Sequence, residues 1–297
     1  MHLPTLRQLE FLCAIDSEGS FSRAADACHV TQPTLSSAVK EIEALLGVQL
    51  VERQSRGASL TPAGHAAVER ARTILSDTAD LVASARQAGT PLSGPFRLGA
   101  IPTIAPFLLP KAVAALRAAH EDLKLYLRED QTDRLLEDLR ERRIDAALIA
   151  LPWDAPGINT MTLAEDEFLL VAPYGHHLLA RKSLRADHLS DEDVLLLDDG
   201  HCLRDHALSV CHLPTGRVSA DVTATSLPTL VHMVAGGLGV SLLPRLAAEG
   251  GVTAGVEVET RAFEAPLIGR QIGIAWRAGS PRAEEARMIG RIVQNAL

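Results

Sequence analysis

The stretch from residue 19 to residue 47, "GSFSRAADACHVTQPTLSSAVKEIEALLG", decides the fold of the N-terminal part of the chain. Serine side chains at its start can cap a short helix that ends at Ala27, and residues 29–30 form the turn that follows. Thr31 can cap the next helix, and Pro33 fits its first turn, where no backbone hydrogen bond is lost. Two short helices joined by a tight turn predict a helix-turn-helix, whose second helix enters the major groove of DNA.

The start of this second helix carries small polar side chains that suit DNA. Free amides at a helix start bind phosphate, glutamine can pair with an adenine edge, and proline or threonine can contact a thymine methyl group. We therefore predict DNA contacts from Thr31, Gln32, Pro33, Thr34, Ser36, Ser37 and Lys40. The periodicity alone fits an ordinary three-helix scaffold as well, and that alternative stays open at this point.

The flanking segments complete a small domain over residues 1–60. Residues 5–16 place apolar side chains at helical spacing and predict a first helix. Residues 48–64, "VQLVERQSRGASLTPAG", alternate around a turn and predict a β wing. The wing carries Arg53 and Arg56, which we add to the candidate DNA contacts.

A long helix is predicted to follow and to form a linker and hinge over residues 61–93. Residues 87–95, "QAGTPLSGP", break this helix with glycine and proline. Small and apolar residues in the helix alternate four and three positions apart, the spacing of a coiled-coil seam, which predicts a homodimer through the linker helix. The alternative is a helix packed on its own domain. The seam positions are Ala67, Ala71, Ile74, Thr78, Leu81 and Ala85.

Residues 94–297 change to short apolar runs, such as "FRLGAI", "LKLYLRE", "DAALIAL" and "QIGIAW", separated by helical segments. This alternation predicts an α/β domain with a parallel sheet and covering helices. Ligands of open α/β sheets bind beyond the carboxyl ends of strands, so Thr103 and Thr132, each just after a strand, are candidate ligand contacts. The alternative is that each threonine only caps a helix.

The composition bounds the function. The chain has 297 residues, 47% of them hydrophobic, and a formal net charge of -8. Residues 1–65 contain five Lys and Arg against seven Asp and Glu, so DNA contact has to come from a local arrangement of groups. We see no signal peptide and no apolar run long enough to span a membrane, and expect a cytoplasmic protein without membrane contact.

Two of the four cysteines lie nine residues apart in "LLLDDGHCLRDHALSVC", residues 195–211. Cys202 falls in the first turn of a predicted helix, where the helix dipole, Arg204 and a protonated His201 favour a thiolate and the preceding pair Asp198–Asp199 opposes it. If Cys202 and Cys211 shared one helix, their Cα atoms would lie about 13 Å apart, against less than about 7 Å in a disulfide. A disulfide would require this segment to refold, as in a redox switch. The alternative is two inert, buried cysteines.

The N-terminal residues resemble the signature of LysR-type transcriptional regulators. The resemblance rests on "FSRAADACHVTQPTLSSAVKEIEALLGVQLVER" (21–53) and "LTPAG" (60–64). It implies DNA contacts from Thr31, Gln32, Pro33, Thr34, Ser36, Lys40 and Arg53, whereas Ser37 stands where many members carry Gln or Arg. It also implies that residues 94–297 fold as two subdomains like those of periplasmic binding proteins. The first would take about 94–166 and 267–297, and the second about 167–266.

The cysteine segment and the residues after it resemble the peroxide-sensing OxyR group of this family. The resemblance rests on "DDGHCLRDHALSVC", "TATSLPTLVHMVAGGLGVSLLP" and "IGIAWRAGSP", and it extends over essentially the whole chain. It implies that Cys202 is the peroxidatic cysteine and Cys211 the resolving one. It also implies a group of residues that bind and activate hydrogen peroxide, namely Thr103, Thr132, His201, Arg204 and Arg277.

These observations predict a regulator that binds promoter double-stranded DNA and switches by a reversible Cys202–Cys211 disulfide to control antioxidant genes. The resemblance further implies a homotetramer that contacts RNA polymerase. We expect no metal and no cofactor, and no enzymatic turnover. The competing hypotheses are a LysR-type regulator with a small organic effector in the interdomain cleft, and a thiol peroxidase, against which the helix-turn-helix weighs.

Overall fold

The structure is a computed structural model that describes residues 3–54, 57–86, 91–153, 155–200, 202–204, 208, 218–265 and 268–297. The chain divides into two compact units, Met1–Gly89 and Thr90–Leu297. No helix in the described ranges has the length and apolar character needed to cross a lipid bilayer.

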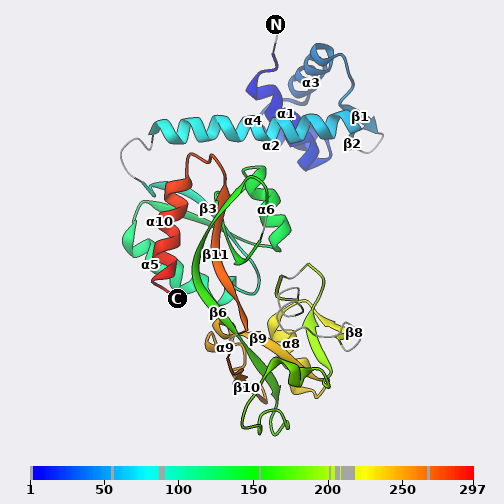
Figure 1. The fold of residues 1–297 in the computed structure, drawn as a ribbon. Coiled ribbons are helices and arrows are strands. Elements are labelled where there is room, and N and C mark those ends of the chain that lie inside the picture. The colour runs from blue at the N-terminus through cyan, green and yellow to red at the C-terminus, as the bar shows by residue number, and fades with distance from the viewer. Residues whose placement is uncertain are drawn as a thin grey trace. The chain divides into compact units, whose positions relative to one another are not determined.

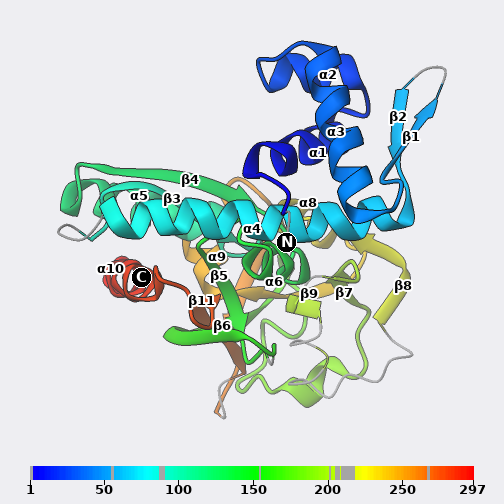
Figure 2. The ribbon, with the colours of Figure 1, turned by 90° about the horizontal axis from the view of Figure 1, so that it is seen from above.

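The N-terminal unit is a winged helix-turn-helix followed by a long helix, which confirms the predicted fold. The β1–β2 hairpin is antiparallel and projects beside α3, as Figure 2 shows. Apolar residues of the helices and the hairpin bury one common core. The elements are α1 (Leu6–Glu18), α2 (Phe21–Ala27), α3 (Gln32–Leu46), β1 (Val51–Gln54), β2 (Gly57–Leu60) and α4 (Pro62–Arg86).

The long helix α4 divides into two parts by the burial of its side chains. Ala71 is buried in the core of the N-terminal unit and Ala67 packs against that core, so this part of the predicted seam packs on its own domain. Farther along, Ile74 is 45% exposed and Leu81 is 67% exposed. The dimer seam therefore stays a prediction for the second part alone, and the side chain of Ala85 lies outside the described residues.

The C-terminal unit contains a nine-stranded sheet in the order β4-β3-β5-β11-β6-β9-β7-β8, with β10 paired to β6. In chain order, the C-terminal unit begins with β3 (Gly94–Ala100), α5 (Ala105–Ala119), β4 (Leu123–Glu129), α6 (Thr132–Arg140), β5 (Ala146–Leu151) and β6 (Ile158–Pro173). The 3-10 helix η1 (Ala186–Leu189), β7 (Val194–Leu197), β8 (Val218–Ala224), α8 (Leu227–Ala235) and β9 (Val240–Pro244) follow. The last are α9 (Arg245–Glu249), β10 (Val258–Ala262), β11 (Gly269–Arg277) and α10 (Ala283–Gln294).

The α/β fold is confirmed, but the prediction of a parallel sheet is wrong for half of the strand pairs. β3 pairs in parallel with β4 and β5, and β7 with β8 and β9. β6 and β11 instead run antiparallel to each other and to their other partners. These two long strands lie side by side (Figure 1), and β6 continues from one part of the sheet into the other.

Two hydrophobic cores lie within this unit. The first subdomain core gathers buried residues of β3, α5, α6, β5, β11 and α10. The second subdomain core gathers the later part of β6 with β7, α8, β9 and β10. The cores separate along β6 between Leu163 and Phe168, so we keep the proposed subdomain boundary near residue 166.

Candidate redox site and DNA-binding helix

The start of α3 has the local geometry predicted from the sequence. Thr31 is extended at φ -79° and ψ 148°, and its Oγ1 accepts a hydrogen bond from the backbone N of Thr34 at 3.4 Å. Leu35 and Val39 point into the core, which turns the opposite face of the helix outward. The buried face of the first turns of α3 is therefore anchored in the core, and the opposite face is open to a ligand.

The predicted DNA contacts of α3 are accessible. Ser36 is half-buried, and the rest are exposed, namely Thr31, Gln32, Pro33, Thr34, Ser37 and Lys40. Ser22 of α2 donates a hydrogen bond to Gln32 Oε1 at 3.0 Å and so orients the amide. The backbone of Arg53 pairs with Ala58 in the wing, but its side chain and all of Arg56 lie outside the described residues.

Two acidic residues of this unit are engaged away from the start of α3, whereas Glu41 accepts a hydrogen bond from Ser37 at 3.4 Å. Asp16 forms a 2.6 Å ion pair with Arg72 of α4. Glu43 Oε1 accepts hydrogen bonds from the backbone N of Leu50 and Val51. Residues 31–40 contain no carboxylate at all. The local charge at the helix start therefore suits phosphate, although the unit as a whole carries more acidic than basic side chains.

The predicted redox cysteine sits where two cores meet. Cys202 is 4% exposed, carries a reduced thiol and packs in the first subdomain core. Leu203, the next residue, packs in the second subdomain core. Since consecutive side chains enter different cores, this short segment connects the two subdomains. His201 and Cys211 lie outside the described residues.

The backbone two residues before Cys202 requires a glycine. Gly200 has φ +91°, and a Cβ there would lie 2.7 Å from Gln131 Oε1. Gln131 is the N-cap of α6, so the cysteine segment runs against the start of that helix. Arg204 is held by its own segment, with Nε 3.0 Å from Asp199 Oδ1 and Nη1 donating to Leu197 O at 3.3 Å.

Both candidate threonines are buried in the C-terminal unit, and neither caps its helix. The N-caps of α5 and α6 are Ile104 and Gln131, so the alternative interpretation as caps is wrong. Thr103 is 2% exposed and Thr132 is 1% exposed. Thr132 Oγ1 has no hydrogen-bond partner among the described residues, which is a rare state for a buried hydroxyl.

A buried arginine that the sequence analysis missed holds Thr103. Arg270 of β11 donates from Nη1 to Thr103 Oγ1 at 2.7 Å and from Nη2 to Thr103 O at 3.1 Å. Its Nε lies 3.0 Å from Asp166 Oδ2, and the two side chains are 0% and 2% exposed. Asp166 also accepts from the backbone N of Leu246 in α9. This hinge network (Thr103, Asp166 and Arg270) ties β6 and β11 to the end of β3.

Arg277 is not part of this hinge network. It stands seven residues beyond Arg270 on the same strand, about 23 Å farther along by the rise of a β-strand. Its Nη1 donates to the backbone O of Ala278, and its charge lowers the pKa of Arg142, which burial lowers more. The assignment of Arg277 to the residues that bind and activate peroxide stays a prediction, and Arg270 is added as the residue that holds Thr103.

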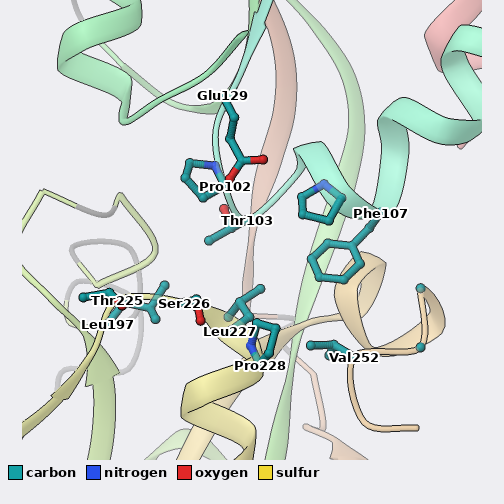
Figure 3. Close-up of a pocket in the computed structure, with 13 residues that line it drawn as sticks. Pro102, Thr103, Phe107, Glu129, Leu197, Thr225, Ser226, Leu227, Pro228 and Val252 are labelled. Carbon is teal, nitrogen blue, oxygen red and sulfur yellow. The ribbon is translucent and has the colours of Figure 1, made fainter. Parts of the chain in front are cut away.

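A cavity of about 600 Å³ opens beside the hinge network. Its upper side is formed by Pro102, Thr103 and Glu129, and its lower side by Thr225 to Pro228, as Figure 3 shows. Phe107 and Val252 close one end. The cavity thus lies between residues of the two subdomains, where a small molecule can contact both.

The cysteines of the N-terminal unit have a different environment. Cys13 and Cys28 are half-buried and reduced, and pack against the core of that unit. Burial raises the pKa of the Cys13 thiol, and Asp16 and Glu10 raise it further against the opposing effect of Arg72. Burial likewise raises the pKa of Cys28. Both thiols are therefore poor nucleophiles at neutral pH.

Comparison with known families assigns both units. Residues 6–65 match the family described as "Bacterial regulatory helix-turn-helix protein, lysR family". Residues 89–297 match the family described as "LysR substrate binding domain". Together the two matches cover the winged helix-turn-helix and the whole of the described α/β unit.

Individual relatives cover nearly the full chain. A "Probable hydrogen peroxide-inducible genes activator" of Streptomyces viridosporus is 39% identical over 99% of this chain and 95% of its own length. The "DNA-binding transcriptional dual regulator OxyR" of Escherichia coli K12 is 38% identical over 93% of this chain and 90% of its own.

Solved structures agree with these relatives. A full-length OxyR variant from Pseudomonas aeruginosa has a TM-score of 0.80 and 36% identity over 99% of this chain and 96% of its own. A peroxide-bound OxyR mutant from Corynebacterium glutamicum has a TM-score of 0.69 and 36% identity. The match covers 99% of this chain and 93% of that one.

Proposed function

The chain belongs to the LysR family of bacterial transcriptional regulators, in the group of hydrogen peroxide-inducible gene activators, and we propose that it senses hydrogen peroxide and controls transcription. The helix-turn-helix binds promoter DNA through the exposed start of α3. The C-terminal unit holds the sensor. The protein acts in the cytoplasm and, unlike an enzyme, consumes one peroxide for each cycle of reduction.

The placement of Cys202 carries this proposal. Its side chain is buried in the first subdomain core, while Leu203 is buried in the second. A chemical change at Cys202 therefore acts on the contact between the subdomains, rather than on a surface loop. This is what a redox switch requires and what an inert packing cysteine does not explain.

The proposed chemistry has two balanced steps. The Cys202 thiolate attacks one peroxide oxygen, the S–O bond forms, the O–O bond breaks, and the second oxygen leaves as hydroxide and takes up a proton to become water. The Cys211 thiol then attacks the sulfur of the sulfenic acid, the disulfide forms and a second water leaves. Glutathione-linked thiols return both cysteines to the reduced state.

The residues around the cysteine segment have distinct proposed roles. Thr132 supplies a buried hydroxyl that no described residue uses, so a peroxide oxygen can take its hydrogen bond. Thr103 accepts from Arg270 and can donate its own hydrogen to the same ligand. Arg270, paired with Asp166, holds Thr103 in the orientation that this role needs. His201, Arg204 and Arg277 remain proposed contributors to peroxide activation, through proton transfer and the shape of the segment.

Disulfide formation removes Cys202 from the first subdomain core, because the chain must bring it to Cys211. The segment that connects the two subdomains then loses one of its two anchors, and the subdomains change their mutual angle. We propose that the protein is a homotetramer built from dimers joined through the linker helix. The change of angle resets how the dimers sit on promoter DNA and how the protein contacts RNA polymerase.

The test is a thiol count and a DNase footprint of the full-length protein before and after an equimolar pulse of hydrogen peroxide. Wild type should lose two thiols and shift its footprint. Cys202→Ser should lose no thiols after the pulse and should keep its original footprint. Cys13→Ser is the matched control, because it removes a half-buried thiol outside the sensor and should respond like wild type.

Two results would count against the proposal. If the wild-type footprint stays unchanged while thiols disappear, the cysteines react without controlling DNA binding. If peroxide is consumed in many-fold excess over protein with a thiol reductant present, the protein turns over as a peroxidase.

The cavity beside the hinge network favours a second candidate function, a regulator that responds to a small organic acid. Its volume of about 600 Å³ suits such a molecule, and it opens between the subdomains. A thermal-shift screen of organic acids tests this, with Val252→Trp filling the end of the cavity as the control. A ligand that stabilises wild type but not the variant, and moves the footprint without oxidation, would support the second function.

A further inference from the structure

Two histidines and a carboxylate gather at the end of the second subdomain opposite the cysteine segment. His176 and His177 follow the end of β6, and Glu192 precedes β7, whose other end leads to Cys202. His177 Nε2 lies 2.9 Å from Glu192 Oε1, and His176 Nε2 lies 3.6 Å from Glu192 Oε2. The two imidazole rings are 4.5 Å apart between centroids.

The backbone holds these three side chains in place. The His176 N–H donates to Pro173 O at 3.1 Å, closing a turn, and Leu179 N donates back to His176 O at 2.9 Å. Glu192 N donates to Leu189 O at 3.1 Å, and Leu189 is 1% exposed. The cluster is therefore anchored to the second subdomain core, and a ligand that binds it has to order few further bonds of the chain.

We propose that His176, His177 and Glu192 form a binding site for a divalent transition metal of the zinc type. One ligand atom from each residue lies within 4.8 Å of the other two. Ligand atoms of a tetrahedral zinc site lie about 3.3 Å apart, given metal–nitrogen distances of about 2.0–2.1 Å, so shifts of about 1 Å complete the site. The fourth position faces solvent beside His177, whose side chain is 63% exposed.

The type of donor selects the metal. Two imidazole nitrogens and one carboxylate suit zinc, cobalt and nickel, whereas magnesium and calcium prefer oxygen ligands throughout. None of the three residues is a cysteine, so the site stays intact through the thiol chemistry proposed for Cys202. The inference therefore stands independently of the peroxide response.

The competing explanation is an ion-pair cluster in which both imidazoles donate to Glu192. The His176 Nδ1 atom accepts a hydrogen bond from Leu178 N, which leaves the proton of the neutral ring on Nε2. A metal at Nε2 displaces this proton and shifts the ring to its other tautomer. The bond from Leu178 is 3.4 Å long, so losing it opposes the metal only weakly.

Titration of untagged, reduced, full-length protein with cobalt chloride, followed by visible absorption, tests the site. We expect one saturable cobalt per chain, displaced by zinc chloride, without the charge-transfer band that thiolate ligands produce. His177→Ala and Glu192→Gln should each lower the cobalt affinity by at least about tenfold, because each removes a ligand. His232→Ala is the matched control, since it removes an exposed histidine of the same subdomain outside the cluster.

The variants also separate metal loss from misfolding. His177 is largely exposed, so His177→Ala should melt at the wild-type temperature in the presence of a chelator. The proposal is overturned if wild type binds no cobalt saturably, or if the folded His177→Ala and Glu192→Gln proteins bind it as tightly as wild type.

Discussion

Thr103 and Thr132 occupy the same kind of position and have opposite surroundings. Each lies three residues beyond the carboxyl end of a strand, β3 or β4, and each is almost fully buried. Thr103 takes two hydrogen bonds from Arg270, one on the hydroxyl and one on the carbonyl. The hydroxyl of Thr132 has no partner among the described residues.

The difference separates a structural anchor from a place prepared for a ligand. An unsatisfied buried hydroxyl costs about 1–3 kcal/mol, and native proteins keep few of them. The buried ion pair of Arg270 and Asp166 supplies the hydrogen bond to Thr103, whereas the hydroxyl of Thr132 is left without one among the described residues. The folded state is therefore less stable than it would be with a partner for Thr132. Binding of a small polar molecule such as peroxide recovers that free energy.

The largest effect should come from removing the centre of the anchor. Arg270→Ala leaves Asp166 buried without its counter-charge, which costs about 3–5 kcal/mol of unfolding free energy. Urea unfolding followed by circular dichroism measures the loss. Arg245→Ala is the control, because its pair with Glu167 involves a side chain that is 42% exposed and should contribute no more than about 1 kcal/mol. Equal losses would mean that the hinge network is not a special anchor.

A smaller effect is expected when only the anchored hydroxyl is removed. Thr103→Val keeps the shape of the side chain but removes the acceptor for Arg270 Nη1. The unfolding free energy should fall by about 1–3 kcal/mol, since a buried charged donor is left unpaired. The same urea titration measures it. A neutral result would show that Arg270 is satisfied by its backbone and carboxylate partners alone.

The matching change at the open hydroxyl should raise the unfolding free energy by up to about 1–3 kcal/mol, because Thr132→Val removes a buried hydroxyl that makes no bond among the described residues. The same change should impair function. The rate at which peroxide oxidises Cys202 should fall by about tenfold or more, as the ligand loses an orienting group. Stopped-flow thiol loss gives the rate. A clear loss of stability with an unchanged rate would reverse the assignment of the two threonines.

The sequence predicted the elements that local signals specify. The capped start at Thr31, the proline in the first turn and the wing all come from short-range chemistry, so α3 and the hairpin were found where they lie. The parallel sheet was wrong because antiparallel pairing of β6 and β11 joins segments more than a hundred residues apart. Nothing in either strand alone reports its partner's direction.

The candidate site was predicted in part for the same reason. Cys202 and the two threonines were found from motifs and strand ends, and Arg277 from the resemblance to a family, whereas Arg270 was missed. The sequence did contain a signal for Arg270. A charged residue at the start of an apolar strand is expected to be buried, and a buried charge needs a carboxylate partner. Its partner, Asp166, precedes an apolar run in the same way, yet only the fold pairs them.

The last and smallest effect concerns the cysteines that the comparison leaves outside the sensor. Because burial raises the pKa of the Cys13 and Cys28 thiols above 9.0, both stay protonated near neutral pH, and their contribution to stability is lost only as pH rises through the raised pKa. Iodoacetamide labelling followed by peptide mass spectrometry should therefore modify them slowly at neutral pH and faster as the pH rises toward the raised pKa. A peroxide pulse before labelling should protect Cys202 and leave both of them unchanged. If peroxide protects Cys13 from labelling as well as Cys202, the reaction of a cysteine with peroxide does not depend on the site at the subdomain boundary. The different surroundings of Thr103 and Thr132 would then not explain how peroxide is sensed.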